Sequence, residues 1–286
     1  RRGGAWQGHR MTAEIGLHPN ITRAAYEAIP AANSSLLKHF ERSAAHAHQE
    51  LVHPPAPTPA LIFGTNFHAA VLEPELFEKT FVVAPKVDRR TVAGRTMWQE
   101  FEAESAGKTI VTADEHATIE GGLQAVWSHP RASALLRGAV HREVGAVWTH
   151  ERTGELCKGL LDCISRDDGW TWVVDLKSTK DASPGAFAAS VARYSYHAQA
   201  AHYMAGLDAI SKHKRRFAWI AVEKEPPYAV AVYSPDEATL LAGEALVERW
   251  LDQYAEAKAS GHWPGYPGEI QSLTVPRWAL KEGDLG

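Results

Sequence analysis

The sequence predicts a mixed α/β fold, in which a central sheet of mostly antiparallel strands is flanked by helices and preceded by a helical region. Three consecutive β-rich runs, separated by hairpin turn signals, predict the antiparallel part of the sheet. Helical patterns precede these runs, and a helix, two strands and a helix follow them. The 286 residues, 45% of them hydrophobic, are enough to bury a sizeable core.

The composition excludes several classes of protein. No apolar run approaches the roughly 20 residues needed to span a bilayer, so no membrane association is expected. Cys157 and Cys163 flank an apolar strand pattern, which favours reduced, buried thiols in a cytoplasmic protein over a disulfide framework. Two cysteines are too few for an iron–sulfur cluster. The net charge of −4 leaves nucleases open, because a local basic rim can hold phosphates on an acidic protein.

The N-terminal part divides into three pieces. Residues 1–10 differ from the rest and are expected to be a leader or vector-derived, with Met11 as the natural start. Residues 11–60 are expected to form an N-terminal helical segment and a proline-rich linker. The pattern is helical from Ile21 to His53, with an N-cap cluster that starts at Asn33. Four prolines between Pro54 and Pro59 predict an extended linker.

Residues 61–270 are expected to form the core domain, and residues 271–286 a C-terminal tail. A strongly apolar helix is predicted over 61–72, and it carries His68. Residues 75–110 mix short strand-like pieces with a charged helix and show no motif of known chemistry. The further elements are predicted in chain order: helices at 113–127 and 130–136, strands at 143–150, 156–165 and 171–177, a helix at 184–207, strands at 216–223 and 228–233, and a helix at 235–259.

Two carboxylates and one ammonium are predicted to meet on the sheet. Asp175 and Lys177 are two residues apart on one strand, so they point to the same face. Asp162 lies on the preceding strand, and the turn signal at 167–169 brings that strand back beside Asp175. Such a set suits phosphodiester hydrolysis: carboxylates hold Mg²⁺, and a lysine orients or deprotonates the attacking water. Whether burial or the carboxylates dominate the pKa of Lys177 is left open by the sequence.

An isolated Asp-x-Lys pair is a weak signal, because charges alternate on many exposed strands. Both carboxylates, however, interrupt apolar runs, where a lone buried charge would cost several kcal/mol. Two such interruptions that face each other across one hairpin favour a metal site over a surface pair.

The same residues resemble the PD-(D/E)XK nuclease superfamily, with its restriction-endonuclease-like core, and within it the C-terminal nuclease of exonuclease VIII (the RecE type) and its phage-borne relatives. The resemblance covers roughly residues 25–260 and rests on blocks that follow the family's order: 33–37, 63–74, Glu143, 158–162, 175–178, 196–203, 222–223 and 226–228.

The resemblance implies a role for each matching residue. His68, Asp162, Asp175 and the backbone carbonyl of Leu176 would bind two Mg²⁺ ions, or Mn²⁺ in their place. Lys177 would be the catalytic lysine, and Glu143 an acidic residue beside the site at a position that varies in the family. The supporting or DNA-contacting residues would be Lys158, Ser178, Tyr196, Gln199 and Tyr203.

Without the resemblance, simpler interpretations hold for some of these residues. A histidine on an apolar helix is more often a core residue than a metal ligand. Tyr196, Gln199 and Tyr203 share one helix face, which by itself indicates packing. The basic run from Lys212 to Arg216 is either a solvated loop or a rim that holds phosphate.

The resemblance implies a 5′ to 3′ exonuclease that acts on linear double-stranded DNA in recombination, in the cytoplasm of a bacterial or phage-infected cell. It also implies a ring-shaped trimer or tetramer and a single-strand annealing protein as a partner. The alternatives are a RecB-like endonuclease or single-strand nuclease, and a non-catalytic DNA-binding subunit. A helicase is excluded, because the sequence has no phosphate-binding loop of the G-x-x-x-x-G-K-[ST] type.

Overall fold

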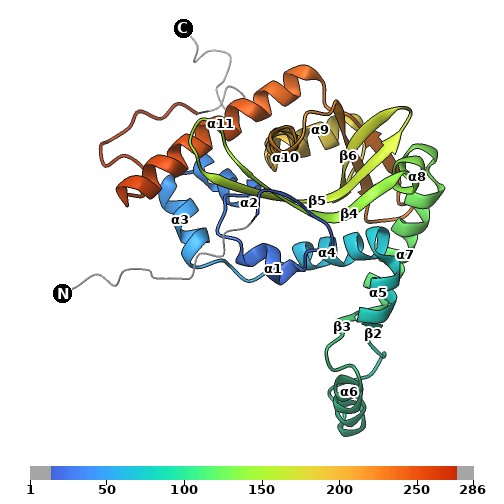
Figure 1. Cartoon of the computed structure of the whole chain (residues 1–286). Coiled ribbons are helices and arrows are strands. Elements are labelled where there is room, and N and C mark those ends of the chain that lie inside the picture. Colours follow the sequence, from blue (N-terminus) through green and yellow to red (C-terminus); the bar gives the residue numbers. More distant parts are fainter. Residues whose placement is uncertain (1–13, 276–286) are drawn as a thin grey trace, which may run out of the picture.

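A computed structural model of the chain describes residues 14–275, and a six-stranded sheet lies at its centre (Figure 1). The leader predicted at residues 1–10, and most of the tail predicted at 271–286, fall outside the described residues. The strand order is β1-β4-β5-β6-β7-β8, and only β6 and β7 are parallel. The bounds are β1 (Gly16–His18), β4 (Ala139–Thr149), β5 (Leu156–Asp167), β6 (Trp170–Thr179), β7 (Arg215–Glu223) and β8 (Val230–Tyr233).

This sheet confirms the predicted fold class, including the antiparallel meander of β4, β5 and β6. The predicted strands match β4 to β8 within a few residues at each end. β1 was not predicted, because three residues are too short to show a period.

Helices cover both faces of the sheet and enclose two hydrophobic cores (Figure 1). The first core contains residues of α2 (Ser34–Leu37), α3 (Ala44–Val52), α9 (Pro184–Arg193), α10 (Tyr196–Ile210) and α11 (Glu237–Ser260). The second core contains residues of α4 (Pro59–Leu72), α5 (Pro74–Thr80), α7 (Ala113–Ser128) and α8 (Pro130–Arg137). Cys157 belongs to the first core and Cys163 to the second; both are buried free thiols, as predicted.

The N-terminal region is helical, as predicted, but it is divided into short pieces: α1 (Arg23–Ala28), α2, the 3-10 turn η1 (Lys38–Glu41) and α3. Pro30 separates α1 from α2, and the Asn33 side chain caps α2 by accepting the Leu36 N–H. Pro59 was assigned to the linker, but it begins α4, because proline is tolerated in the first turn of a helix.

The single helix predicted at 184–207 is wrong: two helices, α9 and α10, occupy this range. The break falls at Tyr194 and Ser195, and Ser195 has a left-handed backbone with φ 58°. No proline or glycine marks this point, and the helical pattern continues on both sides. The sequence therefore shows no signal for the break.

Residues 81–111 form an arm that projects from the body of the protein (Figure 1). β2 (Phe81–Val83) and β3 (Thr109–Val111) pair in parallel at its base, and α6 (Val92–Glu104) lies at its far end. The arm leaves the body after α4 and α5 and returns into α7.

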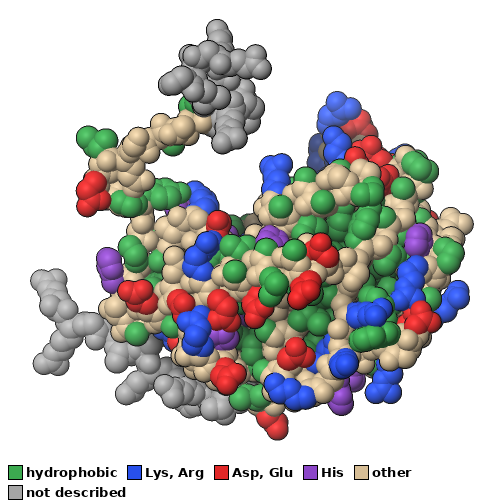
Figure 2. Space-filling model, turned by 90° about the horizontal axis from the view of Figure 1, so that it is seen from above, with side chains coloured by type: hydrophobic (Ala, Val, Ile, Leu, Met, Phe, Trp, Pro, Cys, Tyr) green, Lys and Arg blue, Asp and Glu red, His purple; other side chains and the backbone are tan. Residues whose placement is uncertain are grey.

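Acidic and basic side chains are interspersed on the face shown in Figure 2. Within residues 14–275, no helix has the length and apolar character that a membrane span requires.

Candidate metal centre

The predicted acidic residues lie where β5 and β6 separate. The ladder between these strands begins at Cys163 and Val174, so Asp162 and Asp175 are the residues just beyond the last pair. On β6, Val173 belongs to the first core, whereas Val174 and Leu176 belong to the second. By alternation, Asp175 and Lys177 point to the same face, as predicted, and this face is the side of the first core.

Three side chains from three elements converge next to this point. His68 of α4, Glu143 of β4 and Asp162 of β5 each offer a ligand atom, and these atoms lie within 4.8 Å of one another. His68 Nδ1 is 3.4 Å from Asp162 Oδ2. His68 therefore faces the acidic residues, rather than being a core histidine on an apolar helix.

Glu143 has an unusual backbone, with a positive φ of 45° inside a strand. A non-glycine residue in this region costs on the order of 1–3 kcal/mol, so the surrounding structure must hold it there. Glu143 lies between the ladder pairs Arg142–Cys163 and Val144–Leu161, which places it beside Asp162. The residue with the least secure assignment from sequence thus belongs to the cluster.

Asp175 and Lys177 form the second half of the site. Lys177 Nζ lies 2.6 Å from Asp175 Oδ2, and the Asp175 side chain is only 2% exposed. Lys177 Nζ also lies 4.7 Å from the centroid of the Tyr196 ring, which fixes the ammonium from the α10 side. We call the five residues the site cluster: His68, Glu143, Asp162, Asp175 and Lys177.

The site cluster contains more negative charge than its cations balance. Burial, and then Asp162, raise the pKa of Glu143 to about 7. Burial likewise raises the pKa of Asp175 to about 6, although Lys177 opposes the shift. For Asp162, burial is outweighed by His68 and Lys177, so its pKa is lowered. Glu73, at the end of α4, also raises the pKa of Glu143 and was not singled out in the sequence.

The pKa of Lys177, which the sequence left open, is raised. Burial alone would lower it, but Asp175 and Asp162 outweigh that effect. Burial also opposes protonation of His68, and the Asp162 carboxylate raises the His68 pKa nonetheless. Both cations are therefore stabilised by the carboxylates around them.

The backbone of β6 also takes part in the site. The Leu176 N–H donates to Asp162 Oδ2 at 2.7 Å and so orients this carboxylate. The N–H and C=O of one strand residue point to the same side of the strand. The Leu176 carbonyl is therefore directed to the β5 side, where the resemblance expects a ligand.

Two predicted supporting residues brace β5. Tyr203 donates its hydroxyl to the Leu160 carbonyl at 2.9 Å, and Gln199 Nε2 donates to the Tyr203 hydroxyl at 3.0 Å. A Cβ atom on Gly159 would lie 2.8 Å from the Tyr203 ring, so only glycine leaves room for this contact. These two side chains hold the strand that carries Asp162.

Lys158 and Ser178 are not in the site cluster. Lys158 is buried, and its Nζ donates to the backbone carbonyls of Tyr26, Glu27 and Ile29, at the end of α1. Its role visible in the structure is to attach α1 to β5. Ser178 follows Lys177 on β6 and points to the opposite face by alternation.

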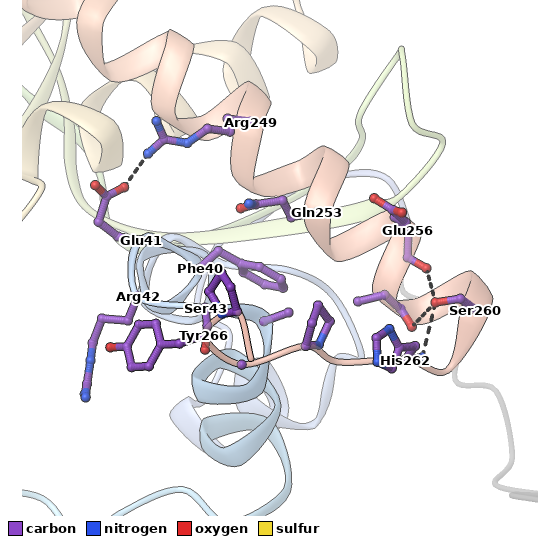
Figure 3. A pocket seen from close by; sticks show the side chains of 15 residues that line it. Phe40, Glu41, Arg42, Ser43, Arg249, Gln253, Glu256, Ser260, His262 and Tyr266 are labelled. Atoms are coloured by element: carbon purple, nitrogen blue, oxygen red, sulfur yellow. Dashed lines mark hydrogen bonds and ion pairs between the residues drawn. The ribbon is translucent and has the colours of Figure 1, made fainter. Parts of the chain in front are cut away.

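A surface hollow lies away from the site cluster (Figure 3). It has a volume of about 540 Å³ and lies between η1, α11 and the segment after α11. The Arg249–Glu41 ion pair spans its edge. None of the predicted site residues lines it, so the hollow is separate from the site cluster.

The site cluster fits a bound metal ion. His68, Glu143 and Asp162 offer one imidazole and two carboxylates whose ligand atoms lie within 4.8 Å of one another. Asp175 is not in this group of three; it lies beside it, where β5 and β6 separate, and is paired with Lys177. A buried carboxylate is costly unless it is paired or coordinates a metal. The excess negative charge and the oxygen-rich donor set therefore suit a divalent cation.

Comparisons with known proteins identify the family of the chain and a solved structure of similar fold. Residues 33–276 match a family described as a PDDEXK-like domain of unknown function (DUF3799). A protein from Eubacterium rectale, provisionally described as an exonuclease, has a similar structure: the TM-score is 0.56 at 13% identity, and the match covers 92% of this chain and 98% of that one. LHK-Exo in complex with dAMP matches with a TM-score of 0.27 at 14% identity, over 68% of this chain and 88% of that one. No curated protein is significantly similar to the chain.

Proposed function

This chain belongs to the PDDEXK-like family of unknown function, and on that premise we propose that it is a metal-dependent deoxyribonuclease that hydrolyses phosphodiester bonds. The observation that carries the proposal is the site cluster: His68, Glu143 and Asp162 offer ligand atoms within 4.8 Å of one another, and the buried Asp175–Lys177 pair lies beside them. Stabilisation of the fold alone does not explain these residues, because the burial of charged groups costs free energy of folding.

Each residue of the site cluster has a proposed task. His68, Glu143, Asp162, Asp175 and the Leu176 carbonyl would hold the metal, with two ions as the resemblance implies. A bound divalent ion would lower the pKa of a water molecule and neutralise charge that develops on the phosphate.

Lys177 would orient the attacking water and stabilise negative charge. Its raised pKa keeps the ammonium protonated at neutral pH in the metal-free protein, which favours this role over that of a base. Tyr196 would hold the ammonium in place, and Tyr203 and Gln199 would support the strand behind Asp162.

The ligand set bears on the choice of metal. Carboxylate and carbonyl oxygens suit Mg²⁺, Mn²⁺ and Ca²⁺, whereas the imidazole of His68 also suits softer ions. We propose Mg²⁺ as the working ion, with Mn²⁺ as an effective substitute because it accepts nitrogen as well as oxygen.

The finer proposal is a 5′ to 3′ exonuclease on linear double-stranded DNA that serves recombination. It rests on the family resemblance of the sequence, as do the ring-shaped trimer or tetramer, the single-strand annealing partner and the location in the cytoplasm. The geometry of the site cluster supports the hydrolysis and does not bear on polarity or subunit number.

The test uses purified protein with linear and circular duplex DNA, with Mg²⁺, with Mn²⁺ and with EDTA. The Lys177→Ala variant is the control. We expect metal-dependent loss of linear DNA only, and none with the control variant. Activity that persists in EDTA or in Lys177→Ala would refute the assigned site.

Two alternatives have distinct results in the same experiment. Cleavage of circular DNA would indicate a RecB-like endonuclease on the same residues. Binding of DNA without cleavage under every metal would indicate a non-catalytic subunit, which the complete ligand set disfavours.

A further inference from the structure

The arm at residues 81–111 has the exposed surface that is expected of a binding segment. α6 stands clear of the body in Figure 1, and of its 13 residues only Gly94 is buried. Val92 and Met97 are 72% and 53% exposed. A helix with so few internal contacts contributes little to the stability of the fold.

The first half of the arm is strongly basic. Four cations, Lys86, Arg89, Arg90 and Arg95, lie within ten residues and are all exposed, with Asp88 as the only acid among them. This local excess contrasts with the net charge of −4 of the whole chain. A concentrated basic segment on an acidic protein indicates a polyanionic partner.

The guanidinium groups are held in place. Arg89 stacks over Trp98, with its guanidinium carbon 4.1 Å from the ring centroid. Arg90 pairs with Asp88 at 3.1 Å, and Arg95 donates to the Arg90 carbonyl. Arg89, Arg95 and Trp98 line one hollow of about 310 Å³ together with Gln99 and Glu102. Because Arg89 and Arg95 already have contacts within the arm, less side-chain entropy is lost when they bind phosphate.

The second basic run, from Lys212 to Arg216, differs from the arm in its exposure and its place. The Arg215 side chain is only 4% exposed and pairs with Asp208 at 2.6 Å, whereas Lys212, Lys214 and Arg216 are exposed. The three arginines of the arm are all exposed, and they lie on a segment that projects from the body. We therefore take the arm as the better candidate for a phosphate contact.

We propose that the arm contacts the sugar–phosphate backbone of duplex DNA through Arg89, Arg90 and Arg95. The contact deepens the proposed function, on which it rests. The arm follows directly on α4 and α5, and α4 carries His68, so a duplex held by the arm stays tethered to the helix that supplies part of the site cluster. Trp98 acts as a positioning residue that keeps Arg89 ready for the phosphate.

The test measures binding of a labelled linear duplex by fluorescence anisotropy in EDTA, where no cleavage occurs. Wild type is compared with an arm variant, Arg89→Ala/Arg90→Ala/Arg95→Ala, and with a matched variant that removes three exposed cations from the body, Lys38→Ala/Arg42→Ala/Arg137→Ala. We expect affinity to fall by about tenfold or more in the arm variant only. The slope of log K against log[salt] should become shallower by about 2 to 3 units, since each lost phosphate contact removes roughly 0.9.

Cleavage kinetics give the second readout. The arm variant should show a raised KM and an unchanged kcat at saturating DNA, whereas Trp98→Ala should show a smaller rise in KM. Equal binding by wild type and the arm variant, while wild type cleaves DNA, would overturn the role of the arm and leave the nuclease proposal standing. A change in sedimentation behaviour with unchanged DNA affinity would show that the arm contacts a second copy, and would also overturn it. Wild type that neither binds nor cleaves DNA would remove both proposals.

Discussion

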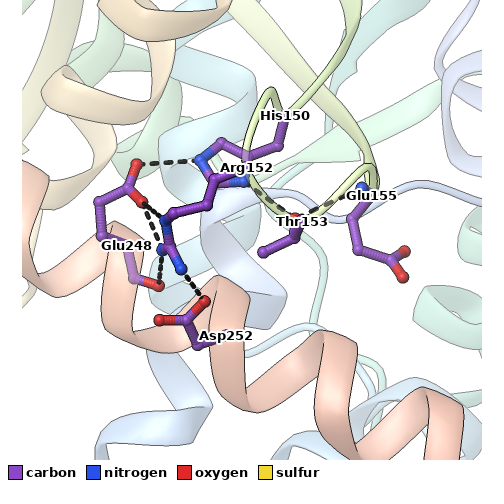
Figure 4. A network of polar contacts seen from close by, with 6 residues as sticks. All are labelled: His150, Arg152, Thr153, Glu155, Glu248 and Asp252. Carbon is purple, nitrogen blue, oxygen red and sulfur yellow. Dashed lines mark hydrogen bonds and ion pairs between the residues drawn. The ribbon is translucent and has the colours of Figure 1, made fainter.

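Two groups of charged residues each include residues of the β4–β5 hairpin, and they differ in how their charges are satisfied. The turn cluster, at the tip of the hairpin and on α11, contains His150, Arg152, Glu248 and Asp252 (Figure 4). Arg152 bonds both Glu248 and Asp252, and His150 Nε2 lies 2.9 Å from Glu248 Oε1. The site cluster lies in the middle of the hairpin, where Asp162 and Asp175 are almost fully buried.

The difference indicates a separate role for each cluster. In the turn cluster each charge has a partner and remains partly exposed, so the cluster joins α11 to the hairpin at little cost. In the site cluster, burial raises the pKa of Glu143 and Asp175, which means that folding works against their charged forms. We infer that the site cluster is retained for chemistry and the turn cluster for stability.

The largest expected effect is on the rate of DNA cleavage, which should differ between a variant of the site cluster and a variant of the turn cluster. Asp175→Asn should lower the rate of DNA cleavage by at least about a thousandfold, because it removes a proposed metal ligand and the partner of Lys177. Arg152→Ala should leave the rate within about twofold of wild type. The measurement is the initial rate on linear duplex with Mg²⁺. An equal loss of cleavage rate in both variants would contradict the proposal that only the site cluster serves catalysis.

The next effect concerns the dependence of stability on pH. The folded state holds a proton on Asp175 up to about pH 6, above the ordinary pKa of 3.8. The folded state therefore binds more protons between pH 4 and pH 6, and the free energy of unfolding falls as pH rises through this window. The loss amounts to about 3 kcal/mol at 1.36 kcal/mol per pKa unit.

Denaturant unfolding in EDTA, at pH values from 4 to 8, measures this loss as the difference between wild type and Asp175→Asn. The variant should gain stability relative to wild type as pH rises, because it carries no carboxylate at this position. A difference that does not change with pH would show that Asp175 is ionised in the fold at no cost.

The smallest effect belongs to the turn cluster. Arg152→Ala should lower the free energy of unfolding only slightly, since Arg152 and its partners are half-exposed. The loss should shrink at high salt, which screens exposed charges. Urea unfolding at two salt concentrations tests this; a large loss that is insensitive to salt would contradict the assignment.

Much of the fold was predictable because its signals are local. The alternation of β4 to β6, the turn at 167–169 and the Asn33 cap each depend on residues close in the chain, and the structure confirms them. The break at Ser195 and the strand β1 gave no such signal, because one is set by tertiary packing and the other is too short to show a period.

The sequence by itself determined which residues meet on β5 and β6, because strand alternation and a hairpin turn dictate that Asp162, Asp175 and Lys177 come together. For His68 and Glu143 no local pattern indicated a place in the site, and only the family resemblance implied one. The tertiary structure brings them to the cluster from a distant helix and from a strand residue with a positive φ. It also decided that the pKa of Lys177 rises, because this depends on the distance to two carboxylates and on burial together. Local patterns state where a side chain points, whereas the balance of desolvation and charge depends on the three-dimensional surroundings.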